Sequence, residues 1–146
     1  MKNCKNKTLK NKHNGNSYYP IKYAIHCKNK KKHSLIIEIL QKIGFTIFNK
    51  ENFGLDHTFL KPPKSFNLKN FYFVIVIKKG GNKQTVKLNK VQGPHIGIRI
   101  NSKILFNKIH KSICNLTKTI IIDKPDEYSL FIDLSCGEIL EIAVKK

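Results

Sequence analysis

Basic and polar side chains recur at alternating positions in three segments of this chain, a spacing that can build a site for an anion. In a β-strand, successive side chains point to opposite faces, so residues two or four apart share a face. Ammonium, guanidinium and imidazolium groups bind carboxylates and phosphates through charge-assisted hydrogen bonds. The paired positions are Lys22 and His26, Lys87 and Asn89, and His95 and Arg99. If these faces line one cavity, that cavity is basic; the alternative is that the lysines are ordinary solvated side chains.

The net charge of the chain favours an anionic partner without identifying it. Twenty-eight lysine and arginine residues oppose nine acids, which gives a formal net charge of +19. The charge is uneven, because residues 57–122 contain 13 basic residues and no acid, whereas residues 123–146 contain six acids. A basic field of this kind attracts phosphates and other anions and speeds their encounter with the protein.

Nucleic acid is the alternative partner that the same charge indicates. A pI near 9.9 is an electrostatic footprint of nucleic-acid-binding proteins. Arginine, the preferred bidentate reader of bases, occurs only as Arg99, and the aromatic motif of RNA-recognition domains is absent from the sequence. Nonspecific binding of lysines to a phosphate backbone therefore stays open.

The predicted elements occur in an order that repeats once along the chain. Alternating residues predict strands, and apolar residues at helical spacing predict helices. The first pass comprises a strand over 20–27, a helix from Ser34 to Ile43 that Gly44 ends, a strand over 45–48, a loop over 49–70, and a hairpin of strands 71–79 and 83–91 joined by Gly80-Gly81-Asn82. The second comprises a strand over 95–100, a helix capped by Ser102, a strand over 118–122, and a hairpin of strands 128–134 and 138–144. We therefore predict an α+β fold of two β-α-β-β-β modules, 20–91 and 95–144.

The length of the chain fits one domain over residues 19–146, preceded by a basic flexible tail over residues 1–18. No apolar run approaches the length of a membrane span, and the Lys/Asn-rich start lacks the apolar segment of a secretory signal. Four scattered cysteines are typical of reduced thiols in the cytoplasm. One of them, Cys114, lies among apolar positions of the second helix and is expected in the core.

Three short motifs lie in order around these elements: Leu40 to Phe45 after the first helix, Pro94 to Ile98 at the fifth strand, and Phe131 to Ile142 across the last hairpin. They are similar to segments of the vicinal-oxygen-chelate superfamily, which includes glyoxalase I, bleomycin-resistance proteins, fosfomycin-resistance enzymes and extradiol dioxygenases. The resemblance covers about residues 20–144. It implies two modules with cupped mixed sheets around a central cavity.

The resemblance also implies metal ligands on the first, fourth, fifth and eighth strands. On the predicted strands these positions carry Lys22, Lys87, His95 and Glu141. A charged ammonium has no lone pair to donate, and two protein ligands are fewer than the three of a catalytic zinc site. His95 and Glu141 are therefore candidate ligands of an incomplete metal site; the alternative is that they form a polar pair.

Charge and resemblance together predict a protein that binds a small anionic ligand. The expected lining residues are Lys22, His26, Lys87, Asn89, His95, Arg99 and Glu141. With a divalent metal as cofactor the protein would be a divergent metal-dependent lyase or dioxygenase, and without one it would be a non-catalytic binding protein. Members of the superfamily often pair modules across a dimer, so the resemblance is compatible with a homodimer.

Overall fold

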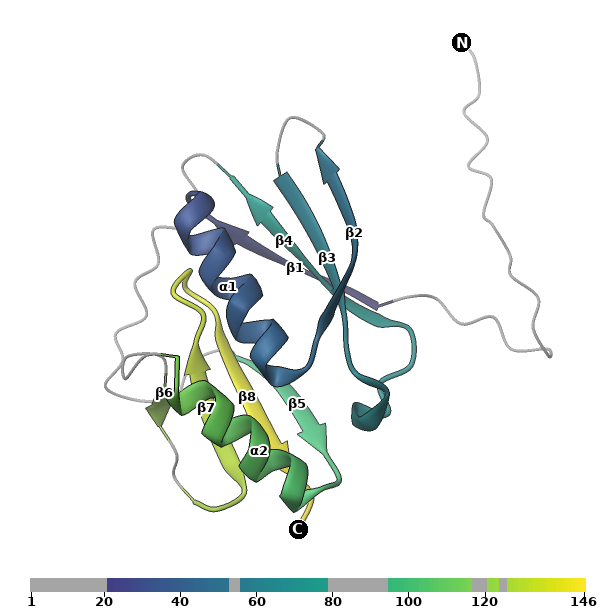
Figure 1. Ribbon diagram of the computed structural model, residues 1–146, viewed down its shortest axis with the longest axis vertical. Coiled ribbons are helices and arrows are strands. Elements are labelled where there is room, and N and C mark those ends of the chain that lie inside the picture. The colour runs from purple at the N-terminus through teal and green to yellow at the C-terminus, as the bar shows by residue number, and fades with distance from the viewer. Residues whose placement is uncertain (1–20, 53–55, 79–94, 117–120, 124–125) are drawn as a thin grey trace, which may run out of the picture.

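The chain folds into two β-α-β-β-β units, shown in the computed structural model of Figure 1. The structure describes residues 21–52, 56–78, 95–116, 121–123 and 126–146. The first unit comprises β1 (Ile21–Cys27), α1 (Lys30–Ile43), β2 (Thr46–Asn52), β3 (Asp56–Lys61), the short 3-10 helix η1 (Lys64–Phe66) and β4 (Phe71–Ile77). The second comprises β5 (Ile96–Ile100), α2 (Lys103–Cys114), β6 (Ile121–Asp123), β7 (Ser129–Asp133) and β8 (Ile139–Val144). Among the described residues, no helix has the length and apolar character needed to span a membrane.

Each unit forms one mixed four-stranded sheet, and the two sheets have the same topology. The first sheet has the strand order β1-β4-β3-β2 and the second β5-β8-β7-β6. In each sheet the first strand of the unit pairs in parallel with the last, and the other neighbours pair antiparallel. A parallel neighbour needs a long crossover, which the helix of each unit provides. The predicted α+β fold of two repeated modules is therefore confirmed.

The first unit differs from the prediction in the position of its last two strands. The predicted loop over 49–70 contains the end of β2 and all of β3, so it was wrong. Residues 71–77, predicted as the third strand, form the fourth described strand of the unit and pair in parallel with the first; the predicted strand over 83–91 and its glycine turn lie outside the described residues. Strand β4 is central and buried on both faces, which explains its unbroken apolar sequence. The glycine pair after β4 is typical of a hairpin turn, so the sequence analysis placed the last two strands of the unit on either side of that pair.

Helix α1 begins earlier than predicted because Asn29, not Ser34, caps it. The Asn29 side chain accepts a hydrogen bond from the Lys32 backbone N–H at 3.0 Å, which satisfies one donor of the first turn. The lysine-rich stretch after Asn29 therefore forms that turn. In α2 the predicted cap is confirmed, because Ser102 Oγ accepts from the Leu105 N–H at 3.1 Å.

A single hydrophobic core joins the two units. Helix α1 packs on β4 and against α2, and α2 packs on β8, so each helix covers one face of its own sheet (Figure 1). The large, fully buried side chains Phe45, Phe73 and Phe106 come from both units. Burying a side chain of this kind contributes roughly 1.5–3 kcal/mol. The other face of each sheet carries no helix among the described residues, and we call these the open faces.

Cys114 does not lie in the core, contrary to the prediction. Its side chain is exposed, although Ile113 beside it is fully buried. Adjacent helical residues point about 100° apart, so the apolar stripe of α2 passes through Phe106, Ile109 and Ile113 and leaves Cys114 outside.

His33 ties the first turns of α1 to β3. Its Nε2 lies 3.1 Å from Thr58 Oγ1, and Thr58 is a buried polar side chain. A buried hydroxyl without a partner would cost about 1–3 kcal/mol, so His33 meets a requirement of the fold. Burial lowers the pKa of His33 below its ordinary value, and the Asp56 carboxylate opposes this shift only in part.

We expect Gly44→Ala to destabilise the fold by about 1–3 kcal/mol. Gly44 ends α1 with a φ of 118°, and an added Cβ would lie 3.2 Å from Pro63 Cγ. Urea unfolding should show a lower midpoint with an unchanged m-value. Gly97→Ala is the matched control, because its Cβ would make only an ordinary contact, 3.5 Å from Glu141 Oε2. Equal destabilisation by both changes would contradict this explanation.

We expect His33 to make the protein less stable as the pH falls below about 6.5. Because the folded-state pKa of His33 is lowered, the unfolded chain takes up this proton more readily. The stabilisation from neutral His33 is therefore complete above the unfolded pKa and is lost as the pH falls through the folded pKa. The free energy of unfolding, measured against pH, should change less steeply in His33→Gln than in the wild type. Ser34→Ala, which removes no titrating group, should keep the wild-type slope; identical slopes for all three proteins would refute the assignment.

Candidate functional site

The predicted site residues that the structure describes lie on the open faces of the two sheets. On β1, Ile25 and Cys27 point into the core, whereas Lys22 and His26 are exposed on the other side. On β5 the same alternation buries Ile98 and Ile100 and leaves Arg99 exposed. The alternation predicted from the sequence is therefore confirmed for these two strands.

The open face of the first sheet contains a pocket of about 320 Å³, which we call the basic pocket. It is lined by Lys22, Ala24, His26, His57, Val74, Val76 and Lys78. Val74 and Val76 form its floor on the central strand β4, and both are buried although they lie outside the main core. The strand register places His26 and His57 on either side of Val76. None of the described residues that line this pocket carries a carboxylate.

The open face of the second sheet has different chemistry, because a histidine and a carboxylate meet there. His95 Nε2 lies 3.0 Å from Glu141 Oε2, and the His95 ring contacts the edge of Phe131 at 5.5 Å between centroids. Glu141 pairs in register with Gly97, which lies two residues after His95 on the neighbouring strand. Both side chains keep part of their surface in water, so such a pair contributes at most about 1 kcal/mol.

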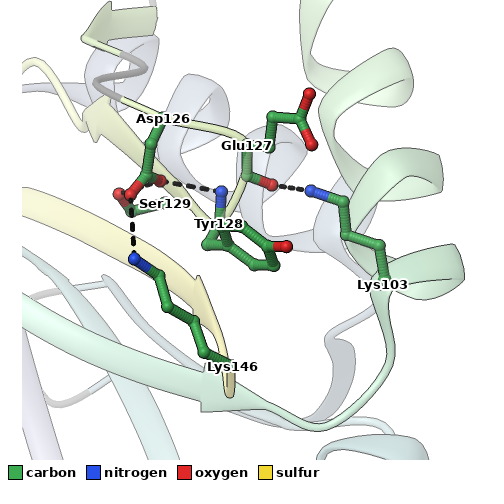
Figure 2. A network of polar contacts seen from close by, with 6 residues as sticks. All are labelled: Lys103, Asp126, Glu127, Tyr128, Ser129 and Lys146. Carbon is green, nitrogen blue, oxygen red and sulfur yellow. Dashed lines mark hydrogen bonds and ion pairs between the residues drawn. The ribbon is translucent and has the colours of Figure 1, made fainter.

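A pocket of about 410 Å³ adjoins this pair, and acids take part in its lining. Its charged lining residues are Arg99, Asp126, Glu141, Lys145 and Lys146. Asp126 accepts from the Tyr128 backbone N–H at 2.7 Å and from Ser129 Oγ at 3.1 Å, and it pairs with Lys146 Nζ at 3.8 Å. Figure 2 shows Asp126 between Tyr128 and Lys146. These contacts, the Tyr128 N–H first, lower the pKa of Asp126. The acid is thus kept charged, and it engages one of the cations of the pocket.

Neighbouring contacts also hold the Tyr128 ring at this end of the second unit. Lys103 donates to the Glu127 carbonyl, and its ammonium lies 4.4 Å from the centre of the Tyr128 ring (Figure 2). Lys146 lies 5.2 Å from the same ring. Two lysines and an aspartate are therefore engaged in holding the chain before β7, and we assign this network a structural role.

A third cavity, of about 470 Å³, lies at the start of α1. Lys50 and His57 line it together with the carboxylates Glu51 and Asp56. His33 also lines it, but that ring is engaged with Thr58. The mixed charges of this cavity make it a weaker anion site than the basic pocket.

The strand register shows which residues of the two sheets occupy corresponding positions, and therefore whether their side chains could bind a metal ion. Gly97, two residues after His95, pairs with Glu141; in the first unit Ala24, two residues after Lys22, pairs with Val74. The first unit therefore offers a lysine and a valine at the positions that correspond to His95 and Glu141. Neither side chain can coordinate a cation in its usual state. The described residues contain no group of three or more histidine, cysteine or acidic side chains that could hold a metal, so they do not fit one.

The predicted lining residues do not gather in a single pocket. Lys22 and His26 line the basic pocket, whereas Arg99 and Glu141 line the pocket of the second unit. Lys87 and Asn89 lie outside the described residues; the described strand that pairs in parallel with β1 is β4, and it does not contain Lys87.

Two further residues of the basic pocket, His57 and Lys78, were missed by the sequence analysis. His57 belongs to β3, in which Thr58 and Leu60 are buried and the residues between and around them are less so. Lys78 directly follows β4, so its place in the pocket depends on the correct identity of that strand.

Comparisons with known proteins identify the fold. A glyoxylase/bleomycin resistance protein/dioxygenase domain from Frankia sp. EAN1pec superposes with a TM-score of 0.59 at 11% identity, covering 89% of this chain and 93% of that one. A mutant of the fosfomycin resistance protein FosX from Listeria monocytogenes, in complex with Mn(II) and 1S,2S-dihydroxypropylphosphonic acid, superposes with a TM-score of 0.58 at 11% identity, covering 86% and 90%. A glyoxalase/bleomycin resistance protein/dioxygenase from Alicyclobacillus acidocaldarius gives 0.55 at 12% identity, covering 86% and 90%.

No protein-family model and no curated protein matches this chain. The structural likeness nevertheless extends over both units, and it agrees with the repeated β-α-β-β-β topology. The chain therefore has the fold of the vicinal-oxygen-chelate superfamily, which the glyoxalase, bleomycin-resistance and fosfomycin-resistance proteins share.

Proposed function

We propose that this protein binds a small anion, a phosphate or carboxylate compound, in the basic pocket of its first unit. The observation that carries the proposal is the lining of that pocket. Two lysines and two histidines surround an apolar floor, and none of the described lining residues is an acid. In the other two cavities, carboxylates stand beside the cations.

The apolar floor of the basic pocket favours binding of the anion at this pocket over a diffuse attraction to the whole charged surface. An apolar surface beneath the ligand excludes water from one side and lowers the local dielectric constant, which makes an ion pair stronger than on an open surface. Hydrogen bonds to charged groups contribute about 1.5–3 kcal/mol each. Lys22 on β1 and Lys78, which directly follows β4, both line the pocket that has Val74 and Val76 as its floor.

A binding protein is favoured here over a divergent metal-dependent lyase or dioxygenase. The FosX complex contains Mn(II) and a phosphonate, but the described residues of this chain offer only His95 and Glu141 where a metal site would need more ligands. We therefore assign these two residues as a polar pair. The free thiols of Cys27, Cys114 and Cys136 support a reducing compartment such as the cytoplasm.

We expect Lys22→Glu to weaken the binding of inorganic phosphate or a small dicarboxylate about tenfold or more, because one charge-assisted contact is replaced by a repulsion. Isothermal titration calorimetry at fixed ionic strength measures the effect. Lys108→Glu, at an exposed position of α2, changes the net charge by the same two units and should leave the affinity nearly unchanged. Equal losses in both variants would show that binding depends on the overall field, and thermal stabilisation by cations in place of anions would also rule out the proposal.

We expect the protein, purified without added metals or an affinity tag, to contain far less than one divalent metal ion per chain. The reason is the donor set, with Lys22 and Val74 in the first unit at the positions of His95 and Glu141 in the second. Elemental analysis measures the content, and a thermal melt with added Mn²⁺ provides a second readout. Stoichiometric metal that disappears in Glu141→Gln would instead support the lyase or dioxygenase alternative.

A further inference from the structure

Three aromatic rings lie beside the basic pocket on the open face of the first sheet. They come from the neighbouring strands β2, β3 and β4, and their centroids lie 6.0 Å apart for Phe48 and Phe59, 5.7 Å for Phe48 and Tyr72, and 6.1 Å for Phe59 and Tyr72. We call them the ring cluster. Phe48 keeps 48% of its surface exposed. A contiguous group of apolar side chains on a surface can mark an interaction site, whereas a single exposed one does not.

The ring cluster and the basic pocket form one continuous surface. Tyr72 pairs in register with Lys22 on the adjacent strand, and Phe59 pairs with Val74 of the pocket floor. Neighbouring strands are about 4.8 Å apart, so Lys22 lies next to the Tyr72 ring, whereas Lys78 lies at the other end of β4. An aromatic platform is thus flanked by a cation on the strand at its edge.

We propose that this face binds single-stranded nucleic acid, with bases stacked on the ring cluster and phosphates at Lys22 and Lys78. The inference rests on the proposed function, because the basic pocket supplies the phosphate contacts. Stacking platforms beside a positive groove are the means by which proteins bind single strands without reading sequence. A duplex has its bases already stacked on one another, so it cannot use the rings.

The charges on this face favour a nucleic acid over a second copy of the chain. If the face met the same face of another copy, Lys22 and Lys78 would be brought close to the same lysines, at an electrostatic cost. A phosphate backbone carries the opposite charge at each nucleotide, and the net charge of +19 adds long-range attraction. The sole arginine, Arg99, lies on the second sheet, so the face lacks a bidentate reader of bases. We expect little sequence preference.

The test is fluorescence anisotropy of the full chain with a labelled oligothymidylate of about twelve nucleotides, within the site sizes known for such surfaces. Phe48→Ala should weaken binding roughly 5- to 150-fold, the range that loss of one stacked base gives. Phe48→Trp should retain binding, because it keeps the ring. Ile104→Ala is the matched control: Ile104 is 82% exposed on α2, away from the ring cluster, and its loss should leave the affinity unchanged.

The lysines give an independent readout through the salt dependence. Lys22→Glu should weaken binding and lower the slope of log affinity against log salt by about 0.7 for each phosphate contact that is lost. Lys108→Glu should change the slope much less. A duplex of the same length should bind more weakly than the single strand.

Failure of this inference can be distinguished from failure of the proposed function. If phosphate binding responds to Lys22→Glu but oligothymidylate binding ignores Phe48→Ala, the stacking proposal is overturned and the anion site stands. If neither phosphate nor oligonucleotide binding responds to Lys22→Glu, the anion site fails as well. A duplex that binds as tightly as the single strand would also overturn the inference. So would a Phe48→Ala variant that dissociates a dimer in sedimentation experiments without changing oligonucleotide affinity.

Discussion

The fold depends on burying one face of each sheet beneath a single helix. Helices α1 and α2 pack on their own sheets and against each other, and this shared layer gives the two units one core. Each unit has only one α-helix among the described residues, and that helix covers one side of its four-stranded sheet. The opposite side is then free for function. On β1 the division is sharp, because Ile25 and Cys27 are buried while Lys22 and His26 face outward.

The pairing of the first strand with the last decides which side chains meet on each open face. In the second unit the β5–β8 register brings Glu141 to His95. In the first unit the equivalent β1–β4 register brings Val74 beside Ala24 and next to Lys22. One topology thus supports an acid–histidine pair in one half and a lysine above an apolar floor in the other. The two units therefore differ at these two positions, with histidine and glutamate in the second and lysine and valine in the first.

The same contrast extends to the charge distribution of the chain. Six of the nine acids lie in residues 123–146, which form much of the second sheet. One of them, Asp126, pairs with Lys146 (Figure 2), and another, Glu141, pairs with His95. The open face of the first sheet has lysines in the basic pocket and rings beside it. The solved structures found by comparison share the fold at 11 or 12% identity, so function has to be argued from these side chains.

The sequence alone determined the features that depend on near neighbours along the chain. Alternation placed Lys22 and His26, and likewise Arg99, on strand faces away from the core, and the Ser102 cap and the Gly44 helix end were both read correctly. The repeated element order was sufficient to predict two β-α-β-β-β units. These signals are local, because capping bonds and strand pleats involve residues a few positions apart.

Only the tertiary structure decided which strands pair and in which register. β3 is short and contains polar residues, so its identity depends on its pairing with β2 and β4, and without it the fourth strand was placed too far along the chain. That pairing places Val74 at the position that corresponds to Glu141 in the second unit. It also brings together the rings of Phe48, Phe59 and Tyr72. The physical reason is that sheet hydrogen bonds join residues far apart in sequence. The register of these strands is selected by the burial of a whole face of the sheet at once. A local sequence pattern does not contain that information.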